Sequence, residues 1–64
     1  MDLDIVITNL NNTIEGKQKM LAKLYARREL NKGADMATYA VCEFLEINIA
    51  ELQRIRDDLV SVVQ

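Results

Sequence analysis

The chain has 64 residues, of which 50% are hydrophobic and 28% are charged, and its formal net charge is −2. This length allows one small domain. The mixture of apolar and charged residues excludes both a disordered tail and a membrane-spanning segment.

Side chains that support catalysis or metal binding are scarce. There is no His, and Cys42 is the single cysteine, which excludes an internal disulfide and a thiolate or imidazole metal site. Nucleophilic catalysis needs a base beside the nucleophile, and Cys42 has no His to activate it. We therefore predict a protein that is not an enzyme and uses no cofactor. The acidic residues 1–4 are not typical of a secretory signal, so we expect a cytoplasmic protein.

The first half of the chain has the apolar spacing of a helix. Alternating steps of four and three residues give six apolar positions out of eight, which predicts a helix over about 2–32. The positions are Leu3, Ile7, Leu10, Ile14, Lys17, Leu21, Leu24 and Arg28. The β-branched residues within 3–8 leave a short strand as the alternative for that segment.

A turn is predicted at residues 33–35. Gly33 can end a helix because it lacks the Cβ that opposes the left-handed conformation, and the Asp35 side chain can cap the amides of a following helix. A second helix is predicted over about 36–63 from the same spacing. Its seam is Thr38, Val41, Leu45, Asn48, Leu52, Ile55, Leu59 and Val62.

So short a link makes the two helices antiparallel, which predicts an all-α helical hairpin forming a single domain over residues 1–64. Folding at the glycine pairs residues whose numbers add to roughly 66. The polar exceptions in the two seams then coincide, Lys17 with Asn48 and Arg28 with Thr38. Lys17 is expected to lay its methylenes over the seam, and a polar layer with Asn48 that fixes register is the alternative.

Two helices leave apolar residues of the second helix uncovered. A homodimer with two-fold symmetry, making a four-helix bundle, would cover them, and we predict Phe44, Ile47 and Ala40 at that interface. The alternative is that these residues pack within the hairpin. The predicted function is that of a helical interaction protein that associates with itself and binds a protein partner. No association with membranes is predicted.

Basic residues in the first helix support a second hypothesis. Lys19, Lys23 and Arg27 are spaced four apart and share one stripe with Arg28 nearby, which is typical of a phosphate-binding ridge in a nucleic-acid-binding regulator. The competing interpretation is a solvated face, with Lys23 approaching Glu43 and Lys19 approaching Glu46 across the hairpin.

Two resemblances accompany these patterns. The single turn and doubled seam resemble the Rop-type RNA-binding hairpin dimers in architecture, without a matching run of residues. Residues 7–14 (ITNLNNTI) and 43–52 (EFLEINIAEL) are similar to small accessory proteins of the exo–xis region of lambdoid phages. That resemblance implies an early phage protein that acts in the host cytoplasm and regulates host physiology, or the choice between lysis and lysogeny, by binding other macromolecules. It assigns no functional residue.

Overall fold

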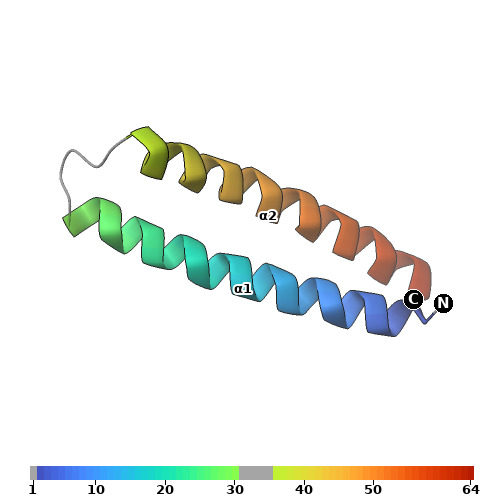
Figure 1. Ribbon diagram of the computed structural model, residues 1–64. Coiled ribbons are helices and arrows are strands. Elements are labelled where there is room, and N and C mark those ends of the chain that lie inside the picture. Colours follow the sequence, from blue (N-terminus) through green and yellow to red (C-terminus); the bar gives the residue numbers. More distant parts are fainter. Residues whose placement is uncertain (1, 31–35) are drawn as a thin grey trace.

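The computed structural model describes residues 2–30 and 36–64, and it places one long helix in each segment. Helix α1 spans Leu3–Leu30 and helix α2 spans Met36–Val63. The two helices run side by side in opposite directions, with the start of α1 and the end of α2 at the same end of the molecule (Figure 1). The predicted all-α hairpin is thus confirmed. The predicted turn at 33–35 lies outside the described residues.

The first turn of α1 is fixed by a side-chain cap. The amide of Asp4 donates a hydrogen bond of 3.0 Å to Oδ1 of Asp2, and the carbonyl of Asp2 accepts from the amide of Val6. Asp2 is therefore the N-cap of α1, and its carboxylate also lies at the positive end of the helix dipole. With this cap, residues 3–8 are helical, so the strand alternative for this β-branched segment is wrong.

The core of the hairpin is thin. Within residues 2–30 and 36–64 the buried hydrophobic side chains are Ile14, Cys42, Leu45 and Ile49, and one of them, Cys42, is exposed by only 1%. The molecule measures 46 by 15 by 15 Å, so each helix has a single neighbour along its length. One helix–helix contact covers a narrow stripe of each helix, which explains why so few side chains are fully enclosed.

The predicted seam of α1 is confirmed. Each of its eight positions, from Leu3 to Arg28, is buried or half-buried. Lys17 and Arg28 are half-buried along with their apolar neighbours, as expected for long side chains whose methylenes cover a seam.

The predicted seam of α2 is wrong at three positions. Val41, Ile55 and Val62 keep 44%, 49% and 72% of their surface exposed. The covered stripe instead contains Cys42, Ile49 and Arg56, which are spaced seven apart and are not among the predicted seam positions. The apolar sector of α2 is wider than the stripe that one neighbouring helix covers. The centre of that sector therefore does not point towards α1.

None of the helices in the described part of the chain is both long enough and apolar enough to cross a membrane.

Candidate functional site

The polar contacts between the two helices gather on one side of the buried stripe. The phenol of Tyr25 donates a hydrogen bond to Oε1 of Glu46, and Nη1 of Arg56 donates one of 3.3 Å to Oδ1 of Asn11. The guanidinium of Arg28 lies 4.2 Å from the centre of the Tyr39 ring and 5.6 Å from that of Tyr25. We call the surface formed by these six residues the polar face.

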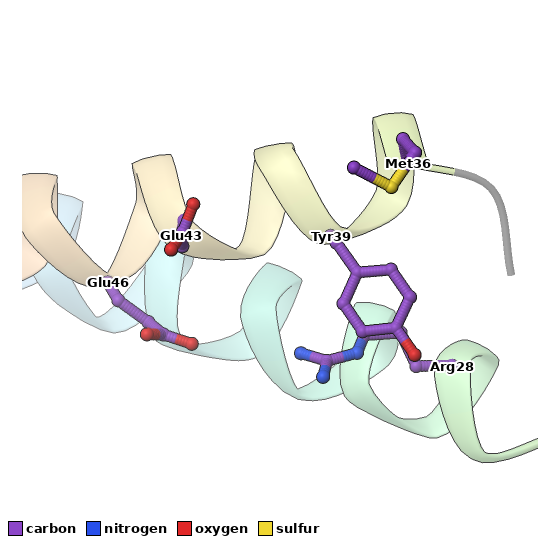
Figure 2. Close-up of a pocket in the computed structure, with 5 residues that line it drawn as sticks. All are labelled: Arg28, Met36, Tyr39, Glu43 and Glu46. Atoms are coloured by element: carbon purple, nitrogen blue, oxygen red, sulfur yellow. The ribbon is translucent and has the colours of Figure 1, made fainter.

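The polar face contains an open hollow of about 520 Å³ near the end of α1. It is lined by Arg28, Met36, Tyr39, Glu43 and Glu46. Figure 2 shows Arg28 reaching from α1 to lie beside the Tyr39 ring, which projects from α2. The Arg28 charge is already engaged by the two aromatic rings, and Glu46 is engaged by Tyr25. Three of the five residues that line the hollow, Arg28, Tyr39 and Glu46, are therefore already used in contacts between the two helices.

Two pKa values on the polar face are displaced by these contacts. The hydrogen bond to Glu46 raises the pKa of Tyr25, because the neutral phenol is the form that can donate to the carboxylate, and loss of hydration adds to the rise. Hydrogen bonding to the Cys42 side chain raises the pKa of Arg28; loss of hydration opposes this rise, and hydrogen bonding to Tyr39 adds to it. Both displacements lie outside the range useful for proton transfer near neutral pH.

The basic stripe of α1 is partly used within the chain. Nζ of Lys19 lies 3.2 Å from Oε1 of Glu15, one helical turn earlier, and both side chains are exposed. Glu46 accepts from Tyr25, so the predicted approach of Lys19 to Glu46 is replaced by two other pairs. Lys23 and Glu43 make no ion pair with another described residue. Of the four basic candidates, Lys23 and Arg27 are left facing solvent.

Arg56 is a contact that the apolar pattern missed. It occupies the covered stripe of α2, seven residues after Ile49, and binds Asn11 of α1 while its Nη2 lies 3.1 Å from Oδ1 of Asp57. The regular spacing of seven from Cys42 through Ile49 to Arg56 is the sequence signal that could have found it.

The opposite side of the buried stripe is apolar. Exposed hydrophobic residues of α2 form what we call the apolar band, with Phe44 exposed by 64% and Ile47 by 61%. Its members are Ala40, Val41, Phe44, Ile47, Ile55 and Val62. At 3.6 residues per turn, Val41, Phe44 and Ile55 lie across the stripe from Tyr39 and Glu46. The residues predicted at a dimer interface are thus solvent-exposed in the single hairpin.

Polar residues interrupt the apolar band, among them Asn48 and the exposed Glu51, which lies seven residues after Phe44. Asn48 lies seven residues after Val41 and seven before Ile55, so it shares their line on the helix. It is half-buried, and its Oδ1 is covered without accepting a hydrogen bond in the described structure. Lys17 is half-buried too, but it does not donate to this oxygen. The two residues therefore form no hydrogen-bonded layer within one chain.

The described residues contain no group of three or more His, Cys, Asp or Glu placed to hold a metal ion. The free Cys42 is buried and has no adjacent base, since the chain lacks His. Comparison with protein-family models, curated proteins and solved structures gives no match.

Proposed function

We propose that this chain is a non-enzymatic helical interaction protein, which pairs with a second copy of itself through the apolar band and binds a protein partner. The observation that carries the proposal is the contrast between the thin core and the exposed band. Phe44 and Ile47 are large and apolar, yet they keep 64% and 61% of their surface exposed. A contiguous exposed band of this kind marks an interaction site.

The dimensions of the hairpin support self-association. One long face measures 46 by 15 Å, so a second hairpin of the same length can lie along all of it. The apolar spacing supports it as well. The predicted seam of α2 includes residues covered by α1, such as Leu45, and residues of the exposed band, such as Val41, so its centre points between the two. A helix in a four-helix bundle presents a side that faces in this way to the centre of the bundle.

A protein partner fits the chemistry of the remaining surface better than nucleic acid does. The chain is acidic overall, and Lys19 and Arg28 are engaged by Glu15 and by aromatic rings. A phosphate-binding surface would have to rely on Lys23 and Arg27. A host-cell protein is the partner class implied by the phage resemblance of residues 7–14 and 43–52. Binding to RNA or DNA that weakens as salt rises would favour the nucleic-acid alternative.

The proposal is tested by placing a charge in the band. Phe44→Glu puts a carboxylate where the second copy would bury a phenyl ring, which is costly without a partner. We expect light scattering coupled to size exclusion to show a dimer for the wild type and a monomer for Phe44→Glu. Ile5→Glu is the matched control, because Ile5 is exposed by 59% and lies outside the band. An unchanged mass for Phe44→Glu contradicts the proposed interface.

A further inference from the structure

The side of α1 that faces away from α2 has basic residues without partners. Residues 17–30 of α1 include five basic residues and one acidic residue, Glu29. Lys23 and Arg27 are exposed, and neither forms an ion pair or a ring contact with another described residue. Glu29 follows Arg27 by two residues, so the two side chains do not face each other. Lys23 lies across the helix from Leu21 of the buried seam, so the basic stripe points away from α2 and lies apart from the apolar band.

Two further residues lie on the same side of α1. Gly16, Lys23 and Leu30 are spaced seven apart, which places them on one line along the helix. Leu30 keeps 85% of its surface exposed, and a Cβ added at Gly16 would meet nothing within 4 Å. Glycine is unfavourable inside a helix, but it lets another backbone approach closely. None of the three contributes to the described packing of the hairpin, whereas a helix packed along this line would contact all of them.

The charge and spacing of this surface select an acidic helix as its occupant. Lys19, Lys23 and Arg27 are four residues apart, which is about 6 Å along the axis for each step. Glutamate or aspartate at the same spacing on a second helix matches such a row, and an apolar residue of that helix would cover Leu30. Phosphates would match only the cations. The line of Gly16, Lys23 and Leu30 has no aromatic ring on which a base could stack.

We propose that the protein partner docks an acidic amphipathic helix along the line of Gly16, Lys23 and Leu30, with its carboxylates paired to Lys23 and Arg27. The two backbones come closest at Gly16. This inference rests on the proposed binding of a protein partner, and it names the chemistry of that partner. The apolar band of α2 remains available to the second copy.

Fluorescence anisotropy with a synthetic peptide tests the charge of the occupant. The probe is a labelled amphipathic helical peptide of glutamate, leucine and alanine. We expect the wild type to bind it, and not to bind the matched peptide in which lysine replaces glutamate. Lys23→Glu should weaken binding about tenfold or more, because it places like charges together. Arg54→Glu is the matched control and should bind as the wild type does, because Arg54 is exposed on α2 and its replacement changes the net charge equally.

A second variant separates helix docking from general attraction between opposite charges. Gly16→Met keeps the charge and places a side chain where the two backbones approach. We expect it to weaken binding of the acidic peptide about tenfold, with the helical circular dichroism spectrum retained because the added atoms meet open space. Ala22→Met is the control, since Ala22 is exposed on the same helix and lies off the line. Equal affinities for Gly16→Met and Ala22→Met would overturn the close approach at Gly16.

The remaining outcomes distinguish this inference from the proposal on which it rests. An acidic peptide that does not bind the wild type, or that binds Lys23→Glu equally well, would overturn the acidic helix. A labelled single-stranded RNA that binds the wild type and loses affinity in Lys23→Glu, where the peptide does not bind, would assign the stripe to nucleic acid. The solution mass of Lys23→Glu should equal that of the wild type, so failure of peptide binding leaves self-association through the apolar band intact.

Discussion

The guanidinium carbon of Arg28 lies 4.2 Å from the centre of the Tyr39 ring, which joins the last turn of α1 to the first turn of α2. Tyr25, on the same helix as Arg28, supplies a second ring at 5.6 Å. Arginine suits this place because its planar group stacks on aromatic rings, whereas the ammonium of lysine is a compact and strongly hydrated charge. The contact closes the end of the hairpin where the chain reverses.

Replacing Arg28 by lysine tests this contact while keeping the charge. We expect Arg28→Lys to lower the midpoint of thermal unfolding, because the stacked arrangement with Tyr39 is lost. Arg27→Lys is the matched control, since Arg27 lies in the same turn and is exposed without a ring contact. Equal midpoints for the two variants would show that the stacking does not stabilise the hairpin.

The hydrogen bond from Tyr25 to Glu46 predicts a loss of stability at alkaline pH. The pKa of Tyr25 is raised in the folded protein, so this contribution is complete below the ordinary tyrosine pKa near 10 and is lost as pH rises through the folded value. Tyr25→Phe removes the titrating group. Urea unfolding followed from pH 8 to pH 11 should show a smaller decline for Tyr25→Phe than for the wild type, and identical declines would argue against the contact.

Gly16 offers a stabilising substitution. It lies inside α1, and a Cβ added there meets nothing within 4 Å. Because glycine in a helix interior is less favourable than alanine, Gly16→Ala should raise the free energy of unfolding by about 0.5–1 kcal/mol. The reverse change at an exposed site of the same helix, Ala22→Gly, should lower it by a similar amount. Chemical denaturation measures both, and a destabilising Gly16→Ala would mean that the surface at Gly16 is covered in the assembled protein.

The core is tested by two isoleucines of the same helix. Ile14 is exposed by 3% and Ile5 by 59%. Truncating a buried isoleucine to alanine removes apolar contacts and leaves a cavity, so Ile14→Ala should cost about 2–5 kcal/mol. Ile5→Ala should change stability by less than about 1 kcal/mol, since its side chain is solvated. Similar costs for both substitutions would contradict the described packing of α1.

The sequence predicts the helices well because their apolar spacing repeats over the whole length of each. In α1 the predicted seam and the covered stripe coincide, from Leu3 to Arg28. In α2 they differ, because the apolar sector also includes Val41 and Ile55, which a single partner helix does not cover. Periodicity locates the centre of an apolar sector, and the number of helices that share the sector decides which residues are enclosed.

The polar contacts could not be predicted from spacing alone. Glu46 was predicted to approach Lys19, but it accepts a hydrogen bond from Tyr25, whose phenol projects across the seam. Lys19 instead pairs with Glu15 on its own helix. Likewise, the cation–π pair between Arg28 and Tyr39 depends on which residues of the two helix ends lie opposite each other. Counting residues across the link predicts this register only to within about one helical turn.

The molecular mass of the wild-type chain in solution tests self-association most directly. Sedimentation equilibrium over a wide range of protein concentration should give twice the 7.3 kDa chain mass, with dissociation to single chains only on strong dilution. A mass of 7.3 kDa at every concentration, with the helical circular dichroism spectrum retained, would show that the hairpin is stable alone and that its apolar band does not bind a second copy.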